Sequence, residues 1–329
     1  MALLEVKDLQ VEFPSRHGVL TALRGVSFSL HAGERLGIVG ESGAGKSMAA
    51  FAILNLVSAP GRITAGEILF EDLDLSKLSD TEMRTVRGDR ISMIFQDPMM
   101  TLNPVLTVGV QMVETLKAHR KISNAEAKRL SIERLREVTI PSPEARFDSY
   151  PHELSGGLRQ RVVIAIALLT DPGVIIADEP TTALDVTIQA EILALLLELC
   201  RNHDVGLILI THDLAVVSQV TQRLLVMYAG RIVEEGPTRS VIEHPLHPYT
   251  HGLIGALPQQ NRPGEPLNQI PGTMPSLDAV PFGCAFHPRC QFADEKCNNE
   301  SPKLRALQDQ IVACHHAERV LARRQEGLI

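Results

Sequence analysis

The stretch that most constrains this chain is Gly-Glu-Ser-Gly-Ala-Gly-Lys-Ser at residues 40–47. It matches G-x-x-x-x-G-K-[ST], the pattern of a loop that cradles phosphate groups. Its glycines allow backbone angles that a Cβ would forbid, so consecutive N–H groups can turn inward and form a nest for an anion. Lys46 supplies an ammonium for the β- and γ-phosphates, and Ser47 supplies a hydroxyl for Mg²⁺.

The segments on either side of this loop favour the same interpretation. Residues 35–39 predict a short buried strand that runs into the loop, and residues 47–57 predict a helix whose positive N-terminal end faces the phosphates. The loop is not a dinucleotide fingerprint, because Met48 stands where G-x-G-x-x-G needs glycine or alanine. An ordinary glycine-rich turn is therefore the weaker reading.

Bulk composition limits the class of protein. A chain of 329 residues with 44% hydrophobic residues can form two domains, or one domain with an extension. The formal charge of −7 gives no electrostatic footprint for nucleic acid. The start does not resemble a secretion signal, and the longest apolar runs are too short to span a bilayer. We therefore expect a soluble protein that could reach a membrane through a partner.

Polar residues follow several predicted strands. Residues 174–177 predict a buried strand, and Asp178 and Glu179 follow at its carboxyl end, where α/β sheets bind ligands. Asp178 suits Mg²⁺ and Glu179 suits a water nucleophile. Strands at 91–95 and 206–210 lead to Gln96 and His212, which could reach the same site, although either type is more often structural.

A second anion site is predicted at Leu-Ser-Gly-Gly-Leu-Arg-Gln, residues 154–160. Ser155 can cap the helix that follows, and Gly156 and Gly157 let the backbone approach a phosphate closely. One chain thus carries two phosphate-seeking helix ends far apart in sequence. Two subunits facing head to tail could sandwich each nucleotide between them.

The remaining segments predict the framework. We expect an edge strand at 3–13, in which Phe13 either stacks on a base or fills the sheet, and further strands at 19–30 and 66–70. Residues 98–161 lack strands, and 123–126 predict a capping box that opens a helix. A hairpin is expected around 229–230. Cys200 is most simply a packing residue.

Composition shifts beyond Gly236, where eleven of the 20 prolines lie. This predicts a loop-rich extension. It contains Cys284, Cys290, Cys297 and Cys314, four thiols that suit chelation better than core packing. Spacing alone leaves a [4Fe–4S] cluster and a Zn²⁺ site equally open, with free thiols or disulfides behind them.

With these motifs in this order, the chain resembles an ATP-binding cassette (ABC) subunit over nearly its whole length. Residues 95–104 (Phe-Gln-Asp-Pro-Met-Met-Thr-Leu-Asn-Pro) and 244–250 (His-Pro-Leu-His-Pro-Tyr-Thr) resemble the oligopeptide, dipeptide and nickel importer ATPases. The four-cysteine tail is similar to that of the dipeptide branch, and this resemblance favours a [4Fe–4S] cluster over zinc, with Zn²⁺ as the alternative.

The resemblance also implies residue roles. Lys46, Gln96, Glu179 and His212 would be catalytic, with Glu179 polarising the attacking water and His212 contacting the γ-phosphate. Mg²⁺ would be held by Ser47, Gln96 and Asp178. ATP would be contacted by Phe13, Gly40, Glu41, Ser42, Gly43, Ala44, Gly45, Lys46 and Ser47, and ATP of the other subunit by Ser155, Gly156, Gly157 and Gln160.

The implied fold is an α/β P-loop cassette: a mostly parallel core sheet with an antiparallel β subdomain, a helical insertion and a loop-rich extension. Its expected domains are an ATP-binding core at 1–97 and 162–235, a helical subdomain at 98–161 and the four-cysteine extension at 236–329.

The implied function is ATP hydrolysis that drives peptide uptake at the cytoplasmic face of a bacterial inner membrane. Expected partners are a second, related ATPase chain, two transmembrane permeases and an extracytoplasmic substrate-binding protein, with no nucleic acid. Nickel or another small solute is the alternative cargo. A soluble non-transport ABC ATPase and a non-hydrolysing sensor are less favoured.

Overall fold

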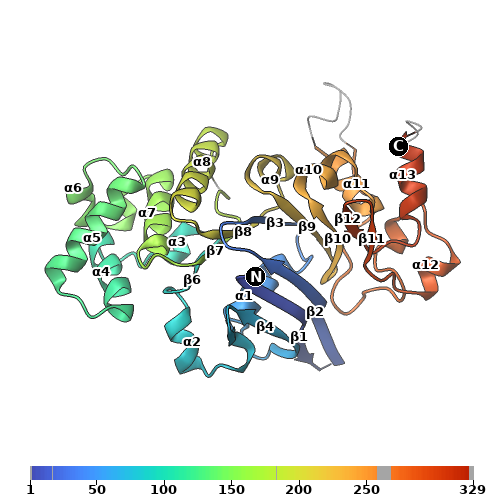
Figure 1. The fold of residues 1–329 in the computed structure, drawn as a ribbon, viewed down its shortest axis with the longest axis horizontal. Helices are drawn as coiled ribbons and strands as arrows, with labels where there is room; N and C mark the ends of the chain where they lie inside the picture. Colours follow the sequence, from blue (N-terminus) through green and yellow to red (C-terminus); the bar gives the residue numbers. More distant parts are fainter. Residues whose placement is uncertain (1, 17, 183, 258–267, 326–329) are drawn as a thin grey trace. The chain divides into compact units, whose positions relative to one another are not determined.

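The computed structural model describes residues 2–16, 18–182, 184–257 and 268–325 (Figure 1). The described chain divides into two compact units. Unit 1 comprises residues 31–34 and 77–209, and unit 2 comprises residues 2–30, 35–76 and 210–325.

Unit 2 contains a four-stranded antiparallel sheet in the order β2-β1-β4-β5. Its strands are β1 (Leu4–Ser15), β2 (Gly18–Leu30), β4 (Arg62–Phe70) and β5 (Leu73–Asp74). The expectation that residues 3–13 form an edge strand is wrong, because β1 pairs with β2 on one side and with β4 on the other. Alternation of buried and exposed residues along β1 indicates one solvated face of an antiparallel sheet and does not by itself identify an edge strand.

A second sheet region of unit 2 runs in the order β11-β12-β10-β9-β3. Strand β3 (Arg35–Val39) is parallel to β9 (Arg223–Tyr228), and β9 forms the predicted hairpin with β10 (Arg231–Pro237). Beyond β10, the extension adds β12 (Gln310–Val312) and β11 (Arg305–Leu307). The extension was expected to be loop-rich, yet it continues the sheet.

Short helices complete unit 2. They are α1 (Lys46–Ile53), α9 (Leu214–Val220), α10 (Thr238–Glu243), α11 (Pro248–Gly255), α12 (Glu295–Asn299) and α13 (Ala317–Gln325), with a 3₁₀ turn η4 at His287–Arg289. Helix α1 ends four residues earlier than the predicted 57. A buried cluster that includes Val39, Tyr228, Tyr249 and Phe286 joins β3 and β9 to the extension.

Unit 1 contains β8 (Gly206–Ile210), β7 (Val174–Asp178) and β6 (Ile91–Ile94) in that order. Every residue of β7 is buried, and β7 is parallel to β6 as the apolar runs predict. The helices are α2 (Asp80–Val86), α3 (Pro98–Thr101), α4 (Val108–His119), α5 (Asn124–Glu137), α6 (Pro143–Phe147), α7 (Gly156–Leu168) and α8 (Val186–Asn202); 3₁₀ turns η1 (Leu75–Lys77, which crosses between the units) and η2 (Pro151–Glu153) complete the set.

The capping box predicted at residues 123–126 forms only in part. The Ser123 hydroxyl accepts the Glu126 N–H at 3.2 Å and so caps α5. The Glu126 carboxylate does not return to the backbone of Ser123, because it accepts two hydrogen bonds from Arg129 instead. Cys200 is 2% exposed in α8, as expected for a packing residue.

Gly230, in the β9–β10 turn, has a backbone conformation and close neighbours that disfavour any residue with a Cβ. Its φ of 78° lies in the left-handed region, and a Cβ would lie 2.3 Å from the Ala22 carbonyl oxygen. Its N–H donates to Ala44 O at 2.9 Å, inside the phosphate loop. We expect Gly230→Ala to lower stability by about 2 kcal/mol or more, measured as a lower melting temperature.

The matched control is Gly255→Ala at the end of α11, where a Cβ would meet nothing within 4 Å. That change should be neutral or stabilise the chain by about 0.5–1 kcal/mol. Equal melting temperatures for Gly230→Ala and the native chain would contradict the crowding seen at Gly230.

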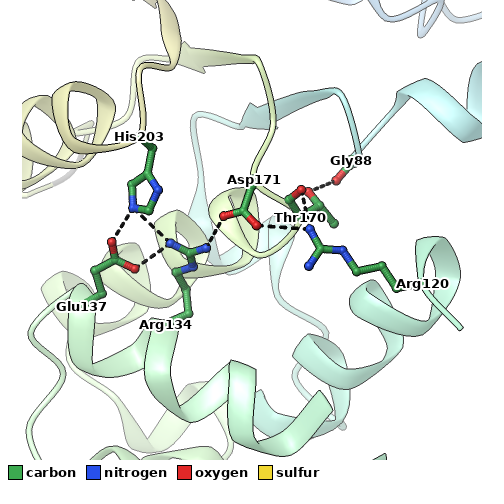
Figure 2. Close-up of polar contacts among 7 residues, drawn as sticks. All are labelled: Gly88, Arg120, Arg134, Glu137, Thr170, Asp171 and His203. Atoms are coloured by element: carbon green, nitrogen blue, oxygen red, sulfur yellow. Dashed lines mark hydrogen bonds and ion pairs between the residues drawn. The ribbon is translucent and has the colours of Figure 1, made fainter. Parts of the chain in front are cut away.

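A polar network ties helix α5 to the turn that precedes β7 (Figure 2). The guanidinium of Arg134 donates to Asp171 Oδ1 at 2.6 Å and to Glu137 Oε2 at 2.6 Å. Arg120 donates to the other Asp171 oxygen at 3.2 Å and to Thr170 O at 2.8 Å. Since the Arg134 side chain is only 12% exposed, it is the buried centre of the network.

We expect Arg134→Met to destabilise the chain by about 1–3 kcal/mol, because two carboxylates lose their shared cation while the apolar stem is kept. The cost is limited by Asp171, whose side chain is 55% exposed. Arg129→Met is the control, since Arg129 pairs with Glu126 and Glu133 on the surface of the same helix. Thermal denaturation of both variants measures the difference; equal shifts would contradict this role for Arg134.

Candidate functional site

The phosphate loop lies in unit 2 between β3 and α1, where the sequence predicts it. Gly40 begins it with a φ of 155°, and a Cβ at this residue would lie 2.3 Å from Met227 O. Gly45 takes the left-handed N-cap position of α1 with a φ of 102° and offers no side-chain cap. The first N–H groups of α1 therefore keep their capacity to bind an anion.

The ammonium of Lys46 is folded over the loop. The side chain is buried at 6% exposure, and Nζ donates to Gly40 O at 2.8 Å and to Glu41 O at 3.1 Å. The positive charge thus sits at the concave side of the loop. A phosphate that enters the loop would exchange these neutral acceptors for charged ones, which form stronger hydrogen bonds.

His212 lies in unit 2, just after β8. The neighbouring Thr211 N–H donates to Ile38 O at 3.2 Å, which places this segment beside the strand that leads into the phosphate loop. His212 is exposed, and Asp213 caps α9 through the N–H groups of Ala215 and Val216. The arrangement matches a residue that reaches a ligand at the strand end.

Gln96 and Glu179 are brought together in unit 1. Ile94 of β6 stands opposite Ala177 of β7, so both residues follow parallel strands at the same sheet edge. The Gln96 amide Nε2 donates to Glu179 Oε2 at 3.2 Å. The Thr182 hydroxyl donates to the same oxygen at 3.0 Å, a contact that the sequence did not predict.

Glu179 also has an unusual backbone. Its φ of 45° lies in the left-handed region, which a non-glycine residue adopts at a cost of about 1–2 kcal/mol. Such strain persists where the surroundings require one side-chain direction, and it concentrates at functional sites. Asp178 before it is 3% exposed, so the two neighbouring carboxylates occupy different environments.

The three residues predicted to bind Mg²⁺ do not belong to one unit. Gln96 and Asp178 lie in unit 1 and Ser47 lies in unit 2. Hydroxyl, amide and carboxylate oxygens are ligands that Mg²⁺ prefers. Their joint role stays a prediction.

The second predicted anion site begins at Ser155, which caps α7 as expected by accepting the Leu158 N–H at 3.4 Å. Ser155 and Gly156 are exposed, and a Cβ on Gly157 would lie 2.9 Å from Ile188 Cγ2. Gln160 is 1% exposed, so its side chain faces the interior of unit 1. Its predicted contact with ATP of another subunit remains untested.

Phe13, the predicted adenine-stacking residue, is half-buried in β1 opposite Leu20. Its ring packs against Gly61, where a Cβ would lie 2.4 Å from Phe13 Cε1. One part of the ring therefore packs against Gly61, and the choice between packing and stacking stays open. Ala183, in the segment 182–185, lies outside the described residues.

The four cysteines of the extension lie near one another in unit 2. Burial raises the pKa of Cys290 to about 11 and that of Cys314 to about 12, and the charges of the other three thiols raise the pKa of Cys314 further. Burial also raises the pKa values of Cys284 and Cys297. Thiolates in this environment need a cation, because a buried group of like charges is unstable without one.

Sulfur spacing bears on which cation fits. Within the described residues, no three of the four sulfurs lie within 4.8 Å of one another, whereas Cys297 forms such a group with Asp294 and His316. A single Zn²⁺ with bonds of about 2.3 Å would need closer sulfurs. Two of the four thiols are buried and two are partly buried, and which metal group they hold stays a prediction.

Three residues of the extension contact the phosphate loop, and none was predicted to do so. Tyr249 and Arg289 bind Glu41, and Met274 lies beside Gly43. The motif at 244–250 contains Tyr249, but nothing in its spacing points to residue 41.

Within the described residues, no helix is both long and apolar enough to cross a membrane. Comparison with known protein families identifies two matching regions of the chain. Residues 23–182 match the ABC transporter family, and residues 233–297 match the oligopeptide/dipeptide transporter C-terminal region.

Individual relatives extend this match over the chain. The oligopeptide transport ATP-binding protein OppD of Escherichia coli K12 is 49% identical over 95% of this chain and 93% of its own length. The dipeptide transport ATP-binding protein DppD of Bacillus subtilis is 50% identical over 91% of this chain and 90% of its own. Among solved structures, a dimeric post-hydrolysis state of the ATP-binding cassette MJ0796 with ADP and Pi covers 72% of this chain and 99% of that chain, with a TM-score of 0.64 and 28% identity.

The chain belongs to the ABC transporter family and is an ATP hydrolase of that class. The relatives that it matches over most of their length are oligopeptide and dipeptide transport ATP-binding proteins. The resemblance and the P-loop cassette fold predicted from the motifs are thereby confirmed.

Proposed function

We propose that this chain is the ATPase subunit of a peptide importer and works at the cytoplasmic face of a bacterial inner membrane. The observation that carries the proposal is the phosphate loop, with Lys46 folded over it, in a chain whose relatives are named for oligopeptide and dipeptide transport. The match of residues 233–297 to the C-terminal region of such transporters supports the peptide branch.

The chemistry follows from the placement of charged groups. The loop N–H groups and Lys46 would hold the β- and γ-phosphates, and Ser47, Gln96 and Asp178 would supply oxygen ligands to Mg²⁺. Glu179, oriented by Gln96 and Thr182, aligns the attacking water, and His212 contacts the γ-phosphate. Most of the rate comes from positioning and charge stabilisation rather than from covalent steps.

Two cassettes complete each site in this proposal. The exposed start of α7, at Ser155 and Gly156, binds the γ-phosphate held by the partner's loop. Hydrolysis removes this bridge and lets the two subunits separate. Loss of the γ-phosphate drives a switch of the same kind in GTPases. The partner is a second, related ATPase chain.

Membrane permeases dock on unit 1 near Gln96 and residues 98–161, which we assign as the helical subdomain between core segments 1–97 and 162–235. Exposed apolar side chains support this surface: Phe95 is 36% exposed, Val105 75% and Val110 41%. An extracytoplasmic binding protein would deliver the cargo.

Transport in proteoliposomes tests the cargo. The native chain, reconstituted with two permeases, a second ATPase and a binding protein from the same organism, should accumulate labelled di- and oligopeptides in an ATP-dependent manner. Nickel or another small solute is the alternative cargo. Uptake of nickel without uptake of peptide would replace the peptide assignment and leave the ATPase assignment intact.

We further propose that the four cysteines hold a [4Fe–4S] cluster that cross-links the extension, residues 236–329. Anaerobically purified protein should be brown and contain iron and acid-labile sulfide, and Cys284→Ser should lose both. Cys200→Ser, which changes the buried thiol of α8, is the control and should keep them. Stoichiometric zinc without sulfide would favour the Zn²⁺ alternative.

A further inference from the structure

We infer that the C-terminal extension positions the phosphate loop through Glu41, with Arg289 and Tyr249 as positioning residues that set the affinity for nucleoside triphosphate. The inference rests on the ATP-binding role of the loop and adds a determinant outside the motifs that define it. All the residues concerned lie in unit 2.

Arg289 clamps the side chain of Glu41. Its Nη1 donates to Glu41 Oε2 at 2.7 Å and its Nη2 donates to Oε1 at 3.0 Å, which is the paired geometry of a strong guanidinium–carboxylate contact. The Arg289 side chain is 5% exposed and that of Glu41 is 31% exposed. The buried member of the pair, Arg289, thus belongs to the extension and anchors the more exposed Glu41.

Arg289 is itself fixed by its surroundings. Its Nε donates to Pro271 O at 2.7 Å, and its guanidinium carbon lies 5.9 Å from the ring centroids of Tyr228 and of Phe286. These contacts leave the guanidinium little freedom to follow Glu41 if the loop moves. The loop must therefore adapt to the extension, rather than the reverse.

Tyr249 holds the backbone of the same loop residue. Its hydroxyl accepts the Glu41 N–H at 2.7 Å, and its ring, 0% exposed, packs edge-on against Tyr228 with 4.7 Å between centroids. Side chain and backbone of Glu41 are thus bound by two different elements, the η4 turn and α11. Met274 lies near Gly43, with its Cγ 3.8 Å from the position that a Cβ would take there.

The charge of Glu41 explains why this clamp matters. A triphosphate carries several negative charges, and an acidic side chain in the loop that binds it repels them. Arg289 neutralises this carboxylate and directs it toward the extension. Without Arg289, the carboxylate would be released next to the phosphates, and the first turn of the loop would lose its side-chain anchor.

Titration of the intact purified chain with a fluorescent ATP analogue and Mg²⁺ tests this role. Arg289→Gln should raise the dissociation constant about tenfold, with a matching rise in KM and a change in kcat below about threefold. Arg289→Lys keeps the charge but not the fork and should fall between the two. Tyr249→Phe keeps the ring and should weaken binding about threefold to tenfold.

The double variant Glu41→Gln with Arg289→Gln separates positioning from simple folding. Since it removes the repelling carboxylate as well, its affinity should return to within about threefold of the native chain. If the double variant binds as weakly as Arg289→Gln alone, the effect does not pass through Glu41 and the inference fails. The content of metal bound to the cysteines is measured in each variant, because Arg289 adjoins Cys290, and it should not change.

Arg305→Gln is the matched control, because it breaks an exposed ion pair with Glu318 in the same extension. It should leave ATP affinity unchanged. Native affinity in Arg289→Gln would overturn the inference while the proposed function stands, provided that Lys46→Ala still weakens ATP binding. Absence of ATP binding by the native chain would instead overturn the proposed function.

Discussion

A Lys46→Ala variant should hydrolyse ATP about 10²–10³-fold more slowly than the native chain, because the loop loses the only side-chain cation placed on its concave side by the described contacts. ATP binding should weaken as well, since the β- and γ-phosphates lose a charge-assisted hydrogen bond. Phosphate release measured at saturating Mg²⁺-ATP gives the rate.

The control for Lys46→Ala is the same substitution at a lysine outside the loop. Lys117→Ala in α4 is suitable, because Lys117 bonds Asn124 on the surface of unit 1 and should leave turnover unchanged. Native turnover in Lys46→Ala would contradict the assignment of the loop. Equal loss in both variants would indicate general destabilisation instead.

Glu179→Gln should separate binding from hydrolysis. Glutamine keeps an oxygen that can accept from Gln96 and Thr182, so the site should hold its shape. It cannot polarise water as a carboxylate does, and hydrolysis should fall about 10²–10³-fold while ATP affinity stays close to native. The uncleaved γ-phosphate should then keep two subunits together.

Light scattering coupled to gel filtration detects this association. With Mg²⁺-ATP, Glu179→Gln should run as a dimer, alone or mixed with its partner ATPase, and without nucleotide it should not. Glu133→Gln on the exposed face of α5 serves as the matched change and should behave as the native chain does. A Glu179→Gln protein that fails to associate in either mixture argues against a shared site.

The local sequence pattern was sufficient to predict those parts of the site whose residues lie close together in the sequence. The loop at 40–47, the Ser155 cap and the β9–β10 hairpin each depend on spacing that is readable along the chain. The sequence placed Gln96 and Glu179 at strand ends that could share one site, but it did not predict the hydrogen bond between them. The pattern did not reveal the left-handed backbone of Glu179.

Long-range contacts were out of reach for physical reasons. Arg289 lies 248 residues from Glu41 and Tyr249 lies 208 residues away, and no periodicity connects positions so distant. Likewise β12 joins β10 although its segment reads as loop-rich, since a three-residue strand has too little alternation to be recognised. The Glu126 carboxylate accepts from Arg129 rather than from the Ser123 N–H. Sequence spacing does not decide which of these two local partners it binds.

The central claim is that bound triphosphate joins two cassettes head to tail. A structure of the Glu179→Gln protein with Mg²⁺-ATP, in its dimeric form, tests it most directly. We expect the hydroxyl of Ser155 and the N–H groups at the start of α7 to contact the γ-phosphate held by the opposite subunit's residues 40–47. A dimer in which this helix start faces solvent, with both nucleotides contacted by one subunit each, would contradict it.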